Sequence, residues 1–327
     1  MTDRLLHLVR PHSHAATGFV DDAVEGSSEG IRAVKLSLVI LGLTAALQAV
    51  LVWLTGSVAL LADTIHNVAD ALTALPLWVA FALSSRAATR RYTYGYGRAE
   101  DLAGIFIVAM IALSAVLAAW ESVSRLIAPR PLAYPWVVMA AGVIGFLGNE
   151  AVATYRIRVG RRIGSAALVA DGIHARTDGF TSLAVVLGAL GALVGLHRAD
   201  PVVGILITVA IIFVLKDAAR SIYYRLMDAI EPELIAQAED CLNDTPGVRD
   251  VDDLRLRWVG HHIRGEASVV VDADATLETA HAIATDAEHR LLHQVPKLIE
   301  VTIHVSPGGD LGTRQHQVIS AHPAGCA

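Results

Sequence analysis

Long apolar stretches separated by short charged segments fill the first two thirds of the chain. Five stretches contain no charged residue: Leu36–Ala62, Leu102–Trp120, Pro131–Asn149, Gly179–Leu196 and Pro201–Leu215. Stretches near 20 apolar residues match the roughly 30 Å hydrocarbon core of a bilayer. With a rise of about 1.5 Å per residue and some tilt, the pattern predicts an all-α bundle of six membrane spans. We expect the spans at residues 33–55, 57–85, 99–127, 132–155, 164–196 and 200–220.

The pattern changes after Asp228 to that of a soluble domain. Helical spacing at Pro232–Asn243 and Thr276–His293 surrounds two alternating segments, Val251–Trp258 and His262–Val271, and a third follows at Leu298–Val305. The order helix, strand, strand, helix, strand predicts a small ferredoxin-like α/β domain. We therefore divide the chain into a mobile cytoplasmic arm (1–31), a six-helix transmembrane domain (32–228), a cytoplasmic ferredoxin-like domain (229–306) and a disordered tail (307–327).

Composition agrees with a membrane protein and excludes several other classes. The 327 residues are 54% hydrophobic and 18% charged, and the mean hydropathy is +0.50. The net charge of −6 gives no basic surface for nucleic acid. The two cysteines, Cys241 and Cys326, have neither a metal-binding spacing nor a disulfide pattern. The first thirty residues show no removable signal peptide, so we expect the first span to direct insertion.

The loop arginines predict the orientation in the membrane. Two loops, after the second and fourth spans, contain Arg86, Arg90, Arg91, Arg98, Arg156, Arg158, Arg161 and Arg162. The opposite side has only Arg125, Arg130 and Arg198. Because positive loops stay on the cytoplasmic side, we expect a multi-pass protein of the cell membrane with both termini in the cytoplasm.

One ionisable pattern, D-x-x-H-x-x-x-D, occurs twice, at residues 63–70 in the second span and 171–178 in the fifth. A spacing of four puts the histidine and the last aspartate of each copy on one helix face, one turn apart. An aspartate near a helix centre costs about 3 kcal/mol on insertion scales, so such residues are rare without a function or a partner. Two imidazoles and two carboxylates suit tetrahedral Zn²⁺. The ligand candidates are His66, Asp70, His174 and Asp178.

Other roles for these polar residues stay open. The quartet would have a purely structural role if its members only made hydrogen bonds between helices. Asp63, Asn67 and Asp171 are candidates for an outer shell that orients the imidazoles. Asp63 and Asp171 fit equally well as residues that cap or line a water-filled access path. Glu150 in the fourth span either joins the cavity or pairs with an arginine such as Arg156.

Three short motifs carry a resemblance to a known family. They are Leu61–His66, Tyr94–Glu100 and Val169–His174, and the small α/β domain follows them. On these marks, residues 32–306 resemble the cation diffusion facilitator family. The resemblance implies a homodimeric antiporter that exchanges a metal ion for protons by alternating access, with the quartet as its transport site. The histidine in both copies resembles zinc-type members, and cadmium, cobalt and manganese are the alternative cargoes.

The resemblance also raises further sites that this sequence matches incompletely. Some relatives bind a second metal through H-x-x-x-H after the second span, where this chain has Tyr92 and Tyr96. Phenols with a pKa near 10 are poor zinc ligands at neutral pH, so we expect no site there. The positions Arg98 and Asp228 resemble a charged pair that locks two subunits together, although Arg98 alone would also serve as an interfacial anchor.

In the soluble domain, three residues match positions at which relatives bind metal: Asp252, His281 and His304. Ser268 and Ser306 stand where a histidine and an aspartate would complete that set, so an intact binuclear site is not expected. His261 and His262 lie close by, either as substitute ligands or as solvated residues of a turn. The N-terminal arm contains further histidines, which either gather metal or belong to an ordinary disordered segment: His7, His12 and His14.

Two other functional classes use the same residues. A membrane metalloprotease would show H-E-x-x-H, which is absent from the sequence, and four protein ligands would leave no open position for a catalytic water. A membrane metal sensor would signal through its soluble domain without transport. Metal uptake into sealed vesicles separates a sensor from a transporter. We expect a divalent-metal exporter that is not an enzyme.

Overall fold

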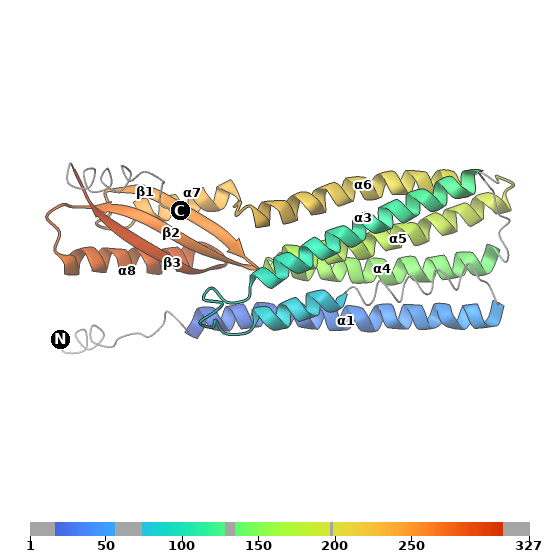
Figure 1. Ribbon diagram of the computed structural model, residues 1–327, viewed down its shortest axis with the longest axis horizontal. Coiled ribbons are helices and arrows are strands. Elements are labelled where there is room, and N and C mark those ends of the chain that lie inside the picture. The colour runs from blue at the N-terminus through green and yellow to red at the C-terminus, as the bar shows by residue number, and fades with distance from the viewer. Residues whose placement is uncertain (1–16, 56–73, 128–134, 197–198, 310–327) are drawn as a thin grey trace, which may run out of the picture. The chain divides into compact units, whose positions relative to one another are not determined.

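The computed structural model describes residues 17–55, 74–127, 135–196 and 199–309. The chain divides into two compact units, residues 1–223 and 224–327, and each is described by itself. The first unit is helical and the second combines helices with one sheet (Figure 1).

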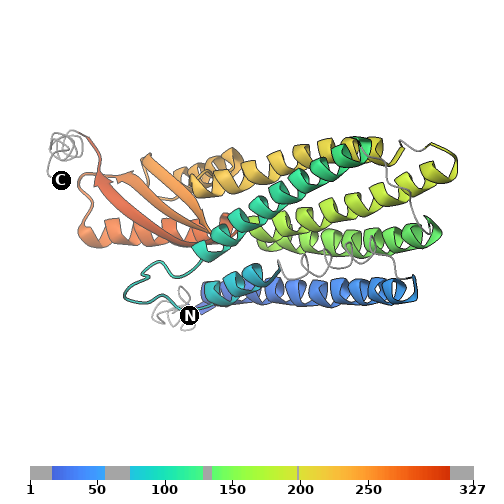
Figure 2. The same cartoon turned by 45° about the vertical axis from the view of Figure 1, so that its right-hand side comes forward.

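Five long helices make up most of the described part of the first unit, and Figures 1 and 2 show them running alongside one another. They are α1 (Thr17–Thr55), α3 (Arg98–Ile127), α4 (Pro135–Ile163), α5 (Ala166–Leu193) and α6 (Ala199–Leu226). Among the described residues, four segments are long and apolar enough to cross a membrane: Gly26–Leu54, Arg98–Ile127, Pro135–Ile163 and Val202–Leu226. These confirm the first, third, fourth and sixth predicted spans as helices of spanning length. The protein is therefore a membrane protein with several apolar spans.

The second predicted span falls largely on residues 56–73, which lie outside the described part of the chain. Its end is a shorter apolar helix, Ala74–Ser84. The fifth is α5, a continuous helix with three charged residues, Asp171, Arg176 and Asp178, in its first half. The count of six spans stays a prediction.

The helices extend further than the hydrophobic pattern predicted. Helix α4 continues to Ile163, so the loop expected after residue 155 is wrong, and its four arginines lie inside the helix. Only Gly164 and Ser165 connect α4 to α5. Gly164 adopts φ +83°, which side chains rarely allow, and its N–H donates to the carbonyl of Gly160 at 2.9 Å. The chain therefore reverses within two residues, and α4 and α5 form a tight hairpin.

Helix α1 begins at Thr17, so residues 17–31 of the expected arm are helical. Extending an existing helix adds one hydrogen bond for each residue that is fixed, whereas starting a new helix is costly. The span therefore continues into a segment whose composition alone suggested no structure.

Helix α4 packs against both α5 and α1, and α3 packs against α5. The α4–α5 contact is close at Gly172, where an added Cβ would lie 3.0 Å from the Cβ of Arg156 and 2.8 Å from Ile157. Fully buried apolar side chains, including Leu77, Phe81, Ile107, Ile111 and Leu168, form the core of the unit. Helix α5 is thus held by neighbours on two sides.

The second unit has the predicted order of elements: α7 (Pro232–Asn243), β1 (Asp250–Val259), β2 (His262–Val271), α8 (Leu277–Gln294) and β3 (Leu298–Pro307). The sheet order is β1-β2-β3, with β1–β2 antiparallel and β2–β3 parallel. Helices α7 and α8 contact each other, and they pack on β1 and β3 respectively, which places both on one face of the sheet. Apolar residues on this face form the core, among them Leu242, Ile263, Val269 and Leu291.

The last turn of α6 belongs to this second unit and contacts the turn between β1 and β2. The Arg225 guanidinium lies 3.8 Å from the ring centroid of Trp258 and donates to the carbonyl of Gly260 at 2.9 Å. Trp258 Nε1 in turn donates to Glu231 at 3.1 Å. Within the second unit, Arg225 is therefore fixed to the sheet by a cation–π contact and one hydrogen bond.

Candidate functional site

Helix α5 begins just before the second copy of the aspartate and histidine pattern. The hydroxyl of Ser165 accepts from the backbone N–H of Leu168 at 3.3 Å, as an N-cap does. The same hydroxyl donates to buried Glu100 of α3 at 3.0 Å. The start of α5 is therefore fixed both within its own helix and to a neighbour, and the whole pattern lies on regular helix.

His174 and Asp178 lie one turn apart on the same face of α5, as the spacing predicted. His174 Nδ1 and Asp178 Oδ2 are 3.7 Å apart, and each side chain is 2% exposed. Two ligands of a tetrahedral zinc ion with bonds near 2.1 Å lie about 3.4 Å from each other. The nitrogen and the oxygen are therefore already close to the separation that one zinc ion requires.

The first copy of the pattern lies outside the described residues. His66 and Asp70, together with Asp63 and Asn67, fall within residues 56–73. Their place opposite His174 and Asp178 remains a prediction, and the described half of the site consists of two residues from one helix.

Asp171, one turn before His174, pairs with α4. Its Oδ2 lies 2.7 Å from Arg156 Nη1, and the two side chains are 0% and 2% exposed. A carboxylate with no exposed surface does not line an open water path in this conformation. The role of Asp171 as an outer partner of the His174 imidazole stays a prediction, and its observed contact is an ion pair that joins α5 to α4.

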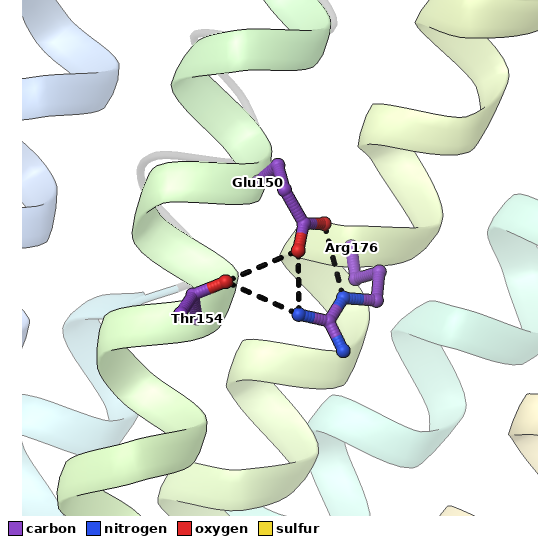
Figure 3. A network of polar contacts seen from close by, with 3 residues as sticks. All are labelled: Glu150, Thr154 and Arg176. Carbon is purple, nitrogen blue, oxygen red and sulfur yellow. Dashed lines mark hydrogen bonds and ion pairs between the residues drawn. The ribbon is translucent and has the colours of Figure 1, made fainter.

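Glu150 also pairs with an arginine across the hairpin, but with Arg176 rather than Arg156 (Figure 3). Arg176 Nη2 and Nε donate to the two carboxylate oxygens of Glu150 at 2.6 and 3.0 Å. The Thr154 hydroxyl donates to Glu150 at 3.1 Å and accepts from Arg176 at 3.2 Å. These three side chains form a bidentate ion pair braced by a hydroxyl.

Sequence reasoning did not find either ion pair, because it treated Arg156 as a loop residue and gave Arg176 no role. One signal was available. Helix α4 contributes a glutamate and then an arginine, whereas α5 contributes an aspartate and then an arginine. In an antiparallel hairpin, residues at similar distances from the turn face each other. The arginine of each helix therefore lies opposite the acidic residue of the other helix. Recognising this required knowing that the turn is only two residues long.

A small cavity approaches the site from α3 and α6. It has a volume of about 120 Å³ and is lined by Glu121, Ser122 and Arg125 of α3, by Thr181 of α5 and by Gly204 of α6, among others. The Thr181 hydroxyl donates to the carbonyl of Asp178 at 2.8 Å. The cavity therefore comes within one turn of the Asp178 backbone.

Tyr92 and Tyr96, the residues at the H-x-x-x-H positions of some relatives, do lie together. Their ring centroids are 4.8 Å apart. Arg91 approaches the Tyr92 ring, with 5.8 Å from Cζ to the centroid. A cation beside a phenol is unfavourable for a second cation, which adds to the case against a metal site there.

The soluble-domain candidates do not converge on one point. His304 lies on β3, in register with Ser268 on β2. Asp252 lies in a bulge of β1, the strand on the other side of β2. Two strand spacings, about 10 Å, therefore separate Asp252 from His304. His281 is on α8 and is exposed. Within the described residues, no group of three or more histidine, cysteine, aspartate or glutamate side chains could hold one metal ion.

His261 and His262 are buried, with exposures of 2% and 9%, so the view of them as solvated turn residues is wrong. Their ring centroids are 4.0 Å apart. They follow Gly260, whose carbonyl accepts a hydrogen bond from Arg225. Cys241 is buried as well, and burial raises the pKa of its thiol, which makes it a poor thiolate ligand.

We predict that the soluble domain binds zinc only weakly by itself. A fragment of residues 224–327, which keeps Arg225, should dimerise without metal, and zinc should raise its melting temperature only slightly, because Asp252, His281 and His304 do not share a site. Analytical ultracentrifugation and thermal unfolding with and without zinc measure both properties. Binding of two zinc ions per chain with nanomolar affinity would contradict this prediction.

Two family models together match most of the chain. Residues 34–227 match the cation efflux transmembrane domain, and residues 230–308 match the cytoplasmic domain of cation efflux proteins.

Curated relatives match over the same range. A probable cation efflux system protein of Mycobacterium tuberculosis is 57% identical over 297 residues, covering 91% of this chain and 90% of that protein. The cation-efflux pump FieF of Cronobacter sakazakii is 29% identical, covering 78% and 85%. The manganese efflux system protein MneP of Bacillus subtilis is 25% identical, covering 77% and 87%.

Proposed function

Because this chain belongs to the cation diffusion facilitator family, we propose that the cation it exports is zinc, which it exchanges for protons. The family consists of cation efflux transporters rather than enzymes. The proposed transport site is the quartet His66, Asp70, His174 and Asp178. The observation that carries the proposal is the buried pair His174 and Asp178, 3.7 Å apart on α5.

The chemistry of this ligand set supports zinc. Two imidazole nitrogens and two carboxylate oxygens suit a tetrahedral Zn²⁺ ion, whereas Mn²⁺ prefers carboxylate, carbonyl and water oxygens. The likeness to a manganese efflux protein makes manganese the second candidate. His174 contributes a nitrogen ligand, whereas Mn²⁺ would favour an oxygen ligand at that position, so His174 supports zinc over manganese. Cadmium and cobalt are further candidate cargoes.

Proton exchange follows from the same ligands. Zinc binds neutral imidazoles and ionised carboxylates, so zinc and protons compete for the quartet, and binding releases any protons that the empty site held. Imidazole changes charge near neutral pH. A site that opens alternately to an acidic outside and to the cytoplasm would therefore release zinc outside and load it inside.

Metal flux into proteoliposomes tests the cargo directly. Purified protein should move zinc faster than manganese at equal free concentration, because imidazole ligands bind manganese less strongly than zinc. Faster manganese flux would replace zinc with manganese as the cargo. Saturable zinc binding with no flux of any tested metal would instead favour the membrane sensor.

We further propose that the protein is a homodimer in the cell membrane with both termini in the cytoplasm. The match to the cytoplasmic domain of cation efflux proteins and the distribution of loop arginines support this arrangement. The proposed lock between subunits is Arg98 with Asp228. Within the chain, Arg98 lies 3.2 Å from Asp101, and Asp228 is an exposed residue with φ +55°.

Charge reversal tests the lock. Arg98→Asp and Asp228→Arg should each weaken the dimer because like charges then face each other, and the double reversal should restore it. Cross-linking in membranes measures the dimer fraction. A full dimer fraction in both single variants would show that these residues do not hold the subunits together.

A further inference from the structure

Two ion pairs join α5 to α4, one formed by a residue before His174 in the sequence and one by a residue after it. Asp171 pairs with Arg156 at 2.7 Å, and Arg176 pairs with Glu150 at 2.6 Å. Asp171 is three residues before His174, and Arg176 is two residues after it. The turn of α5 that carries His174 therefore has an ion pair to α4 before it and another after it in the sequence.

The helical geometry shows what these contacts fix. At about 100° per residue, Asp171 and Arg176 lie about 140° apart around α5. Between them lies the strip that packs on α4, with Gly172 against Ile157 and Gly179 3.4 Å from Asn149, measured from an added Cβ. His174 and Asp178 lie beyond the Asp171 edge, about 60° and 20° from it. A rotation of α5 that turned the ligands away would have to separate one of the two pairs.

The pair at the far edge has the geometry of a rigid brace. Arg176 presents two N–H groups to two oxygens of Glu150, a fork geometry that fixes orientation as well as distance. Thr154 bonds both partners (Figure 3). The side chains of Arg176 and Glu150 are 35% and 34% exposed, so they lie on the outer edge of the hairpin and do not line the ligand face. Ionisable residues inside membrane helices usually serve a function, and this pair touches neither His174 nor Asp178.

We propose that Glu150 and Arg176 are positioning residues of the transport site. They hold α5 at the rotation in which His174 and Asp178 face the metal ion, acting from the side of the helix opposite His174. The inference rests on the proposed function, because it assigns the two residues to the same metal site. Glu150 thereby acquires a role that its sequence position left open.

Equilibrium metal binding to the full-length protein in detergent tests this role. Arg176→Gln and Glu150→Gln should each raise the zinc Kd about 10- to 100-fold, the usual effect of losing a group that orients a ligand. Arg176→Lys should also weaken binding, because it keeps the charge but loses the fork. The reversed pair Glu150→Arg with Arg176→Glu should recover most of the affinity. Cobalt absorption, which reports tetrahedral coordination, should change in the single variants and return in the reversed pair.

A matched control is available on α8. Arg290 and Asp286 form an ion pair of 2.8 Å within one helix of the soluble domain, so Arg290→Gln removes a similar contact outside the membrane helices. It should leave the zinc Kd and the cobalt spectrum unchanged. A wild-type zinc Kd and cobalt spectrum in folded Arg176→Gln and Glu150→Gln would overturn the positioning role alone. Failure of the wild-type protein to bind zinc or cobalt would overturn the proposed function and this inference together.

Discussion

Replacing Asp178 by alanine is expected to reduce zinc flux in proteoliposomes to the level of vesicles without protein. Asp178 is 2% exposed and lies 3.7 Å from His174. Its removal leaves a divalent ion with fewer ligands and one negative charge less in a region of low dielectric, where an uncompensated charge is costly. Radioactive zinc uptake measures the flux.

Tyr92→Ala is the matched control for this prediction. Tyr92 is 47% exposed and packs on Tyr96, outside the α5 pattern, so the variant should keep zinc flux near the wild-type value. Asp70→Ala should behave like Asp178→Ala if the two copies of the pattern share one ion. Full zinc flux in Asp178→Ala would remove this residue from the transport site.

Replacing Arg156 by methionine is expected to destabilise the protein severely. The substitution leaves Asp171, which is 0% exposed, without its partner at 2.7 Å. Breaking a buried ion pair in this way typically costs about 3–5 kcal/mol, because an uncompensated charge stays in the interior. Thermal unfolding of the purified protein in detergent measures the change.

The double variant Arg156→Met with Asp171→Asn distinguishes the lost pair from lost packing. It removes both charges and should recover much of the stability, since neutral replacements of buried pairs are often tolerated. Arg125→Gln, which breaks a more exposed pair on α3, should cost about 1 kcal/mol or less. If Arg156→Met alone were as stable as the wild type, Arg156 and Asp171 would not be a critical pair.

The sequence predicted the elements of the soluble domain closely. Each element is short, its apolar residues follow a clear helical or alternating spacing, and it ends at a proline, a glycine or a polar segment. Helix α7 and strand β2 have the predicted bounds. The ends of the membrane helices were less predictable. Hydrophobicity marks where lipid surrounds a helix, and α1 and α4 continue beyond that region.

The spacing of His174 and Asp178 was predictable because it depends only on helix periodicity. The contacts of Asp171 and Glu150 were not, because they depend on the register between two helices. That register is set by the two-residue turn at Gly164 and by the close packing at Gly172. The burial of His261 and His262 similarly depends on how the turn between β1 and β2 packs in the folded domain, which the local sequence of the turn does not reveal.

The most direct test of the central claim measures zinc flux and internal pH together in proteoliposomes with an imposed pH gradient. With the compartment that receives zinc about one pH unit more acidic, zinc flux should rise and protons should move in the opposite direction, because both compete for the same ligands. Both signals should disappear in Asp178→Ala. Zinc flux that ignores the gradient, with no counter-movement of protons, would contradict antiport and leave facilitated diffusion in its place.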